Sequence, residues 1–319
     1  MRAAVYERYG APAVVRVTSR DRPVPGEGEV LVRVGAASIT APDVAARSGR
    51  PLFSRLFFGL TAPKLPVLGS DFAGSIVEVG AGVDSFAIGD IVWGATGPAF
   101  GAHAEYVVVS ANGVIAPVPT GFSHLDAAAL VYGGLTALPF LREGAQLSAG
   151  QRILVNGASG AVGSIAVQLA KHFGAEVTAV CSGRNADLVR SLGVDHVIDY
   201  ATDNFTRSGE QWDVVLDVVG RSSFRTARRV LAPNGIYLSA VPSAGTLLAS
   251  RLTPARAKIL FTGLRADALA LADLAVLGEL ALQGALVPVI DHAFPLAAVV
   301  EAHERVEHGP KVGTVLLTM

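Results

Sequence analysis

The chain has 319 residues, of which 51% are hydrophobic, so it can form one large domain or two ordinary domains with separate cores. Its 26 basic and 27 acidic residues give a net charge of -1, and this balance argues against electrostatic binding to nucleic acid. The single cysteine, Cys181, excludes a disulfide framework and a four-cysteine zinc site.

The sequence also lacks the usual signals for export or membrane insertion. The N-terminal stretch MRAAVYERYG has no apolar core of the kind found in signal peptides. The most apolar late stretch, 268–290, is interrupted by Asp273, Glu279 and Gln283. We therefore expect a soluble, cytoplasmic protein with no membrane partner.

The first third of the chain is rich in valine, glycine and proline, and its apolar runs are short. This pattern predicts an irregular, mostly β region. The expected strands cover 3–6, 14–17, 29–34, 74–80, 91–93 and 104–109.

Near Ser123 the pattern changes, and Ser123 is placed to cap a helix that begins at 124. After Gly150, apolar strands alternate with amphipathic helices, which predicts a parallel sheet covered on both faces. The expected strands are 153–156, 176–180, 196–199, 213–219, 235–241 and 258–261, and the helices between them are 161–173, 186–192 and 222–231. For the tail we expect a helix at 267–282, a strand at 287–290, a helix at 295–307 and a strand at 314–318.

The stretch NGASGAVGSIAVQLAK, 156–171, joins a strand to a helix and has glycines at 157, 160 and 163. This context is typical of a dinucleotide-binding turn, because glycine lets the backbone approach a pyrophosphate and the helix N-terminus attracts the anion. A glycine-rich turn without a nucleotide is the alternative. The cofactor-binding residues expected here are Ser159, Gly160, Ala161, Val162 and Gly163.

The residues after the second strand of this unit bear on the choice between NAD and NADP. In an NAD site an acidic residue follows that strand, but here Cys181-Ser182-Gly183-Arg184-Asn185 contains no carboxylate. A guanidinium can pair with a 2′-phosphate, and a hydroxyl can donate to it. We therefore expect NADP(H), held by Ser182, Arg184, Asn185 and Tyr200. The alternative is that Arg184 is a solvated surface residue and Asn185 a helix cap.

Several longer motifs follow one another in the order of a known family. They are LPVLGSDFAGSIVEVGAGV at 65–83, FAIGDIVWG at 86–94, AHAEYVVV at 102–109, GGLTAL at 133–138, the glycine turn, SLGVDHVIDY at 191–200 and KVGTVLL at 311–317. In these motifs the chain resembles the zinc-free quinone oxidoreductase branch of the medium-chain dehydrogenase/reductase superfamily. The resemblance covers nearly the whole chain.

The resemblance implies an α/β protein with a Rossmann domain inserted in a mostly β, GroES-like catalytic domain. The GroES-like domain is expected at 1–122 plus 264–319, and the Rossmann NADP-binding domain at 123–263. The cofactor is expected in the cleft between these domains. The family geometry also places Val219, Ala240 and Val241 at the cofactor.

Zinc-dependent relatives have Gly-His-Glu where this chain has Gly69-Ser70-Asp71, and a cysteine where it has Thr40. Serine and threonine are poor zinc ligands, and the seven histidines include no pair at a ligand spacing, so no metal is expected. Without a Lewis acid, the hydride acceptor should already be electron-poor, as a quinone or an α,β-unsaturated carbonyl is.

By resemblance, Thr136 lies beside the nicotinamide, and Thr40, Asp43 and Tyr132 line the substrate side. Zinc-free relatives usually carry asparagine at the position of Thr40. The catalytic candidates are therefore Thr40, Tyr132 and Thr136. Structural alternatives are a Thr136 hydroxyl bonded to the preceding turn, a packed Tyr132 ring, and Asp43 as a helix cap.

Three functions are compatible with the sequence. The first is an NADPH-dependent quinone or enone reductase, the second an enoyl-thioester or other activated-alkene reductase, and the third a weakly catalytic NADPH-binding sensor or structural protein. The expected partners are a small electron-poor substrate and a second copy, joined through the edge of the Rossmann sheet near 237–241 or 258–261. Segment 50–64, with Phe53, Phe57 and Phe58, either closes over the cleft or packs as an apolar helix against the core.

Overall fold

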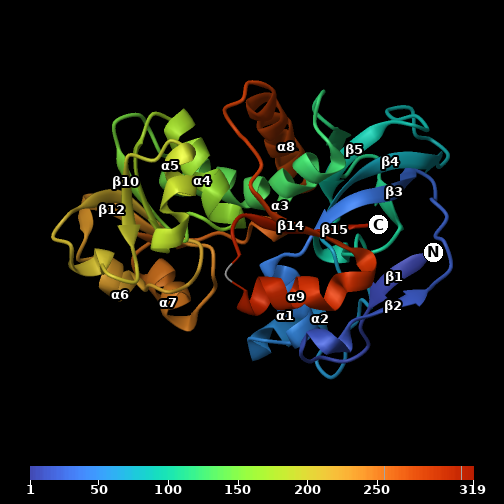
Figure 1. The fold of residues 1–319 in the computed structure, drawn as a ribbon, viewed down its shortest axis with the longest axis horizontal. Helices are drawn as coiled ribbons and strands as arrows, with labels where there is room; N and C mark the ends of the chain where they lie inside the picture. Colours follow the sequence, from blue (N-terminus) through green and yellow to red (C-terminus); the bar gives the residue numbers. More distant parts are fainter. Residues whose placement is uncertain (255, 310) are drawn as a thin grey trace. The chain divides into compact units, whose positions relative to one another are not determined.

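The computed structural model describes residues 1–254, 256–309 and 311–319. Contacts divide it into two compact units. Unit 1 comprises Met1–Tyr132, Leu264–Leu282 and Pro288–Met319, and unit 2 comprises Gly133–Gly263 and Gln283–Val287. The division falls inside helix α3 (His124–Pro139), whereas the change of sequence pattern lies at its start (Figure 1).

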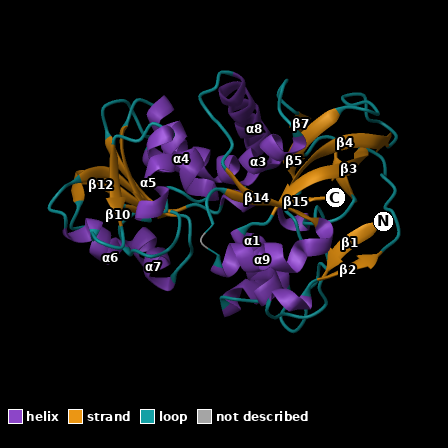
Figure 2. Cartoon of the chain, viewed as in Figure 1, coloured by secondary structure: helices purple, strands orange, loops and turns teal. Residues whose placement is uncertain are grey.

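Unit 2 is built on a six-stranded, fully parallel sheet in the order β10-β9-β8-β11-β12-β13. Helices α4 and α5 lie on one face of the sheet, and α6 and α7 lie on the other (Figure 2). This is the predicted doubly wound architecture, in which the carboxyl ends of all strands meet at one edge. The strands are β8 (Arg152–Asn156), β9 (Glu176–Cys181), β10 (His196–Asp199), β11 (Trp212–Asp217), β12 (Leu231–Ser239) and β13 (Ala257–Ile259). The helices are α4 (Ala161–His172), α5 (Ala186–Ser191), α6 (Phe224–Ala227) and α7 (Ala244–Leu252).

The core of unit 2 lies between this sheet and its helices. Trp212, Val215 and Tyr237 are fully buried in one cluster, and the indole N–H of Trp212 donates to the hydroxyl of Thr178 at 3.0 Å. The central strands are apolar on both faces because both faces are covered, as the unbroken apolar runs in the sequence predict. Burial of this kind stabilises the unit by about 25 cal/mol per Å² of apolar surface.

Unit 1 contains a seven-stranded sheet in the order β14-β15-β3-β4-β5-β7, with β6 pairing with β3, and a separate two-stranded sheet of β1 and β2. All pairs are antiparallel except β14 with β15. The strands are β1 (Arg2–Val5), β2 (Arg16–Ser19), β3 (Glu29–Ser38), β4 (Asp71–Val79), β5 (Ile91–Ala95), β6 (Tyr106–Ser110), β7 (Val114–Pro117), β14 (Ile290–Pro295) and β15 (Thr314–Thr318). The helices that lie wholly in this unit are α1 (Ala41–Ser48), α2 (Arg55–Phe58), α8 (Asp267–Leu282) and α9 (Val299–His308).

Two predicted strands of unit 1 were misplaced. The strand expected at 14–17 begins with a 3-10 turn, Pro12–Val14, because proline favours the first position of such a turn, and the strand follows only at Arg16. The strand expected at 287–290 begins only at Ile290, the last residue of the predicted range, and extends to Pro295.

Within the described residues one helix, His124–Ala145, is long and apolar enough to span a membrane, and 72% of its apolar window is buried, as in a core helix.

Candidate functional site

The glycine turn lies at the carboxyl end of β8 and leads into α4. Gly157 has φ +92°, and the backbone N–H groups of Gly157 and Ala158 both donate to the carbonyl of Val180, at 3.0 and 3.1 Å. A positive φ is readily adopted by glycine and strained for other residues. The turn is therefore tied to the neighbouring strand β9 before the helix begins.

The two later glycines differ in what surrounds them. A Cβ on Gly163 would lie 2.1 Å from the carbonyl oxygen of Gly157, so the absence of a side chain at Gly163 lets α4 pack against the turn. A Cβ on Gly160 would meet only that same oxygen, at 3.5 Å. Gly160 is the N-cap of α4, and no side chain caps this end within the described residues. The turn thus leaves open space in front of an uncapped helix N-terminus, which fits a phosphate group.

The predicted ribose-side residues gather at the end of β9. The Asn185 amide donates to the hydroxyl of Ser159 at 3.0 Å, which links the glycine turn to the turn after β9. The backbone N–H of Tyr200 donates to the carbonyl of Cys181 at 3.1 Å, and the Tyr200 side chain is exposed. Arg184 is exposed, and none of the ion pairs of the described residues involves it. Arg184 therefore offers an exposed guanidinium from the same turn that carries Ser182 and Asn185.

One carboxylate near this turn was missed by the sequence reasoning. Asp199 ends β10 and pairs in register with Cys181, the last residue of β9. An ideal Cβ on Gly183 would lie 2.3 Å from a carboxylate oxygen of Asp199, so this acid packs directly against the turn that holds Arg184. The other oxygen accepts the backbone N–H of Ala201 at 3.0 Å. Strands that follow one another in a strand-helix-strand unit often pair, and pairing of β9 with β10 would have placed Asp199 beside Cys181.

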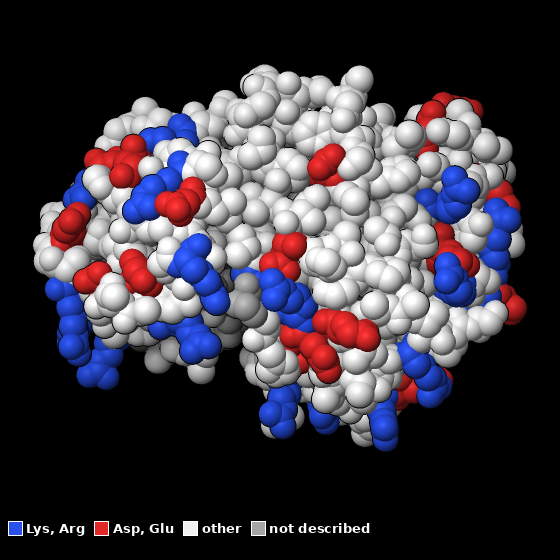
Figure 3. All heavy atoms as spheres, viewed as in Figure 1, with Lys and Arg blue, Asp and Glu red and all other residues white. Residues whose placement is uncertain are grey.

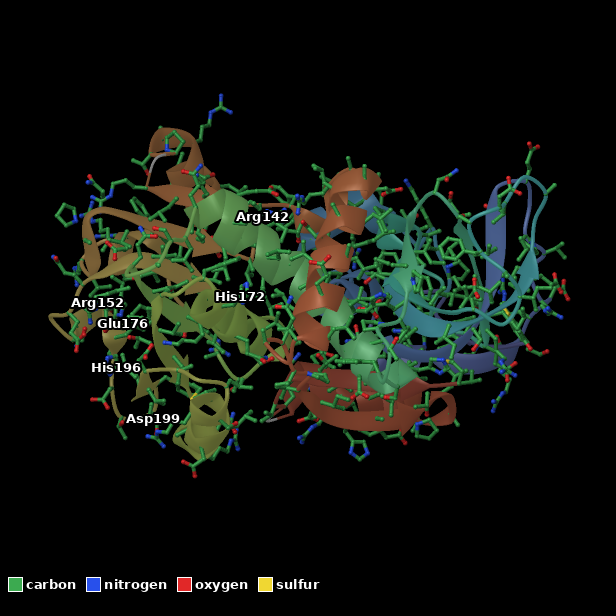
Figure 4. All side chains as sticks on the ribbon, turned by 90° about the horizontal axis from the view of Figure 1, so that it is seen from above. Arg142, Arg152, His172, Glu176, His196 and Asp199 are labelled. Atoms are coloured by element: carbon green, nitrogen blue, oxygen red, sulfur yellow. The ribbon has the colours of Figure 1, made fainter. Side chains whose placement is uncertain are left out.

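The ion pairs at the starts of the same strands belong to a different edge of the sheet. Arg152, Glu176 and His196 begin β8, β9 and β10, and Glu176 lies 3.2 Å from each of the other two (Figure 4). Because the strands are parallel, these groups lie at the amino ends, away from the glycine turn and from Asp199. We assign this cluster to structure and not to the site.

A second missed residue, Asp217, organises the end of β11. Its buried carboxylate accepts backbone N–H groups from Val219, Gly220 and Ser222 at 2.8 to 3.0 Å, and the Asn156 amide at 3.1 Å. A carboxylate with several N–H donors can fix a loop firmly. The signal in the sequence was an acidic residue at the end of an apolar strand.

Three of the predicted cofactor residues lie around this loop. A Val219 methyl lies 2.5 Å from an ideal Cβ on Gly157, and a Val241 methyl lies 2.9 Å from an ideal Cβ on Gly220. The Ala240 N–H donates to the carbonyl of Asp217 at 2.9 Å. The structure therefore brings the ends of β8, β11 and β12 together at the glycine turn.

In unit 1, Thr40 and Asp43 form a capping box at the start of α1. The Thr40 hydroxyl donates to the Asp43 carboxylate at 2.5 Å and accepts the Asp43 N–H at 3.3 Å. Asp43 also accepts the N–H of Gly69 at 2.8 Å. The alternative that Asp43 is a helix cap is therefore confirmed. The Thr40 hydroxyl is occupied by this cap, and its predicted catalytic contact stays a prediction.

A second buried acid, Asp71, lies close to the same group. It accepts the N–H and the hydroxyl of Ser38 at 2.8 and 2.5 Å. Burial raises the pKa of Asp71 to about 7, even though the Ser38 hydrogen bonds lower it. Burial also raises the pKa of Tyr132 above its usual range, and Asp43 and Asp71 raise it further. Tyr132 thus remains protonated at neutral pH, and Asp71 can hold a proton there.

The remaining catalytic candidate, Thr136, lies on α3 in unit 2 and is nearly buried. Its hydroxyl makes no hydrogen bond within the described chain, so the alternative of a bond to the preceding turn is not realised. Among the described residues no group of three or more histidine, cysteine, aspartate or glutamate side chains is arranged to hold a metal ion. The Thr40 hydroxyl and the Asp43 carboxylate bond to each other, and Asp43 also accepts the backbone N–H groups of Thr40 and Gly69.

Comparisons with known proteins agree with this architecture. Residues 26–120 match the family "Alcohol dehydrogenase GroES-like domain", and 192–317 match "Zinc-binding dehydrogenase". The mitochondrial NAD(P)H oxidoreductase RTN4IP1 of Bos taurus is 33% identical over 100% of this chain and 89% of its own length. The chloroplastic quinone-oxidoreductase QR1 of Triphysaria versicolor is 33% identical over 99% and 98% of the two chains.

A solved structure, the quinone oxidoreductase from Coxiella burnetii, superimposes with a TM-score of 0.89 at 29% identity and covers 100% of this chain and 99% of its own. The Rossmann-type sheet of unit 2, the GroES-like unit 1 and these relatives lead to one assignment. The chain is an oxidoreductase with a nicotinamide cofactor, and it belongs to the quinone oxidoreductase branch of the medium-chain dehydrogenase/reductase superfamily.

Proposed function

We propose that this protein is an NADPH-dependent, zinc-independent reductase that transfers hydride to a quinone or an α,β-unsaturated carbonyl. The observation that carries the cofactor choice is the exposed Arg184 in the turn after β9, close in sequence to Ser182, at the position where an NAD site carries an acid. A guanidinium there pairs with a 2′-phosphate in two hydrogen bonds. The open space at Gly160 and the uncapped start of α4 support pyrophosphate binding at the same edge.

When bound, the reduced nicotinamide supplies the hydride, and the protein supplies positions and protons. Reduction of a quinone or enone by hydride leaves negative charge on an oxygen, which then takes up a proton. We propose that the protonated Tyr132 hydroxyl donates a hydrogen bond to that oxygen, because its raised pKa keeps the proton in place. The Thr136 hydroxyl, which has no partner in the described chain, is the proposed contact on the cofactor side.

Asp199 offers a sharp test of the cofactor choice, because its carboxylate lies against the turn of Arg184. If the pocket holds a 2′-phosphate, Asp199→Asn removes a repulsion and tightens NADPH binding, and Arg184→Ala weakens it about tenfold or more. If the pocket holds the hydroxyls of NAD, Asp199→Asn instead weakens NADH binding, and Arg184→Ala changes little. Titration of both variants with both cofactors separates the two outcomes.

Turnover measurements with different acceptors identify the acceptor class. Preference for a quinone over a simple enone supports quinone reduction, and the reverse ranking supports the activated-alkene alternative, including enoyl thioesters. Cofactor binding without turnover of any acceptor supports the sensor alternative.

We also propose a homodimer through β13, the edge strand of the unit 2 sheet, because an exposed edge can pair with a second copy. The cytoplasmic location stays a prediction.

A further inference from the structure

Segment 50–64 of unit 1 exposes five of its large apolar side chains. It folds as a 3-10 turn, Leu52–Ser54, followed directly by α2, Arg55–Phe58. Four of its large exposed apolar residues lie in the 3-10 turn and α2, and the fifth, Leu60, follows Gly59 after the helix has ended. We call these residues the outward apolar face, and they are Leu52 (72% exposed), Phe53 (46%), Leu56 (68%), Phe57 (63%) and Leu60 (67%).

The opposite side of the segment is fixed to the body of unit 1. Ser54 is buried, and the Phe58 ring packs edge-on against Phe100 with centroids 5.7 Å apart. The Tyr9 hydroxyl donates to the carbonyl of Gly59 at 2.5 Å, and the Lys64 N–H donates to the carbonyl of Phe58 at 2.9 Å. These contacts on the inner side of the segment hold the outward apolar face in place. Of the two expectations for this segment, packing against the core holds for Phe58 but not for Phe53 and Phe57.

The charges that accompany this face all have one sign. Arg50, Arg55 and Lys64 lie within 50–64, and the segment has no acidic residue. Arg50 and Lys64 are exposed, and the Arg55 guanidinium lies over the Tyr9 ring, 4.5 Å from its centroid. A chain with a net charge of -1 thus concentrates three cations beside five exposed apolar residues. Figure 3 shows Lys and Arg side chains along the lower edge of unit 1, where α1 and α2 lie in Figure 1.

The neighbouring acid does not cancel these charges. Glu307 lines the groove that it shares with Arg50 and Arg55, but it forms an ion pair with the buried guanidinium of Arg47. None of the ion pairs among the described residues involves Arg50, Arg55 or Lys64. The surface is therefore both apolar and basic, a combination that fits the interface of an anionic lipid membrane.

We propose that unit 1 docks peripherally on an anionic membrane surface through the outward apolar face and its cations. A symmetric contact with a second copy is disfavoured, because it would bring Arg50 and Lys64 against the same cations of the partner. The proposal replaces the expectation of no membrane partner, which rested on the lack of a spanning segment and a signal peptide. A face that lies in the interface requires neither of these. The proposal does not depend on the cofactor or the substrate.

The test is flotation of the full chain with vesicles of phosphatidylcholine, alone or mixed with phosphatidylserine. We expect binding to the mixed vesicles, weaker binding to the neutral ones, and partial release by salt. Leu56→Ser with Phe57→Ser should reduce the bound fraction about tenfold or more, because the apolar insertion is lost. Arg50→Glu with Lys64→Glu should have a similar effect, at about fivefold or more for each charge reversed.

A matched control removes apolar surface elsewhere in unit 1. Ile88 and Leu282 are 70% and 59% exposed, but Ile88 lies between Asp84 and Asp90 and Leu282 near Glu279, so Ile88→Ser with Leu282→Ser should bind vesicles like the parent. Circular dichroism checks that every variant is folded. No binding of the parent to the mixed vesicles, or equal losses in the control, would overturn the proposal. Self-association that Leu56→Ser with Phe57→Ser abolishes, without vesicle binding, would assign the face to a second copy instead.

Discussion

Replacing Gly163 by alanine should destabilise unit 2, because the new Cβ has no room. It would lie 2.1 Å from the Gly157 carbonyl oxygen and 2.8 Å from the Ala158 Cα, and ordinary contacts begin at 3.4 Å. The turn or the helix must therefore move by more than an ångström. Overpacking of this kind costs about 1–3 kcal/mol, and the gain in helix propensity offsets up to about 1 kcal/mol.

Gly160→Ala is the matched control for stability and the test for binding. Its backbone has φ −87°, which alanine adopts without strain, and its Cβ meets only one atom, at 3.5 Å. The unfolding free energy should change by no more than about 1 kcal/mol, because the loss at the N-cap and the gain in backbone entropy oppose each other. The methyl group would nevertheless occupy the space in front of α4, so NADPH affinity should fall about tenfold or more.

Thermal unfolding and cofactor titration of both variants check this account. At about 2–4 °C per kcal/mol, Gly163→Ala should lower the Tm by several degrees, whereas Gly160→Ala should leave it nearly unchanged. The assignment of roles would be refuted if Gly163→Ala unfolds at the parent temperature. It would equally be refuted if Gly160→Ala binds NADPH as the parent does.

Further predictions concern single carboxylates and a tyrosine. The pKa of Asp71 rises from 3.8 to about 7 on folding, so protonation of Asp71 stabilises the folded state. This stabilisation is fully present below about pH 4, decreases as the pH rises, and is lost above about pH 7. The unfolding free energy of the parent should therefore fall by about 4 kcal/mol, relative to that of Asp71→Asn, as the pH rises from 4 to 7. Denaturant unfolding at several pH values measures this difference. An equal pH dependence of the two unfolding free energies would contradict it. Asp217→Ala leaves the Val219, Gly220 and Ser222 N–H groups without their acceptor and should cost about 2–4 kcal/mol, together with cofactor affinity, whereas unchanged affinity would remove this loop from the site. Tyr132→Phe should lower kcat with little change in cofactor Kd, and an unchanged kcat would exclude its hydroxyl from the reaction.

The sequence predicted well those features that depend on neighbours along the chain. The alternation of strands and helices after Gly150 led to the parallel sheet, and the glycine spacing led to the turn at β8. Asp126 and Asp43 follow Ser123 and Thr40 by three residues, and both pairs form helix caps in the structure. These patterns are local, so one sequence is enough to recognise them.

Features that depend on how strands, turns and helix faces are arranged in space were harder to predict. Asp199 reaches the turn of Arg184 only because Asp199 pairs with Cys181 across β9 and β10. Asp217 gathers donors from the loop that follows it, and their approach depends on the turn geometry. Segment 50–64 has helical spacing, but spacing alone does not say whether Phe57 or Phe58 faces the body of the protein.

The most direct test of the central claim is the oxidation of NADPH by a small quinone. The purified chain is mixed with NADPH or NADH and with 1,4-benzoquinone, 9,10-phenanthrenequinone or a simple enone, in the presence and absence of a chelator, and the absorbance of the reduced nicotinamide is followed. We expect oxidation that is faster with NADPH than with NADH, requires the acceptor and is unaffected by the chelator. Oxidation that the chelator abolishes, or that proceeds equally well or better with NADH, would contradict it.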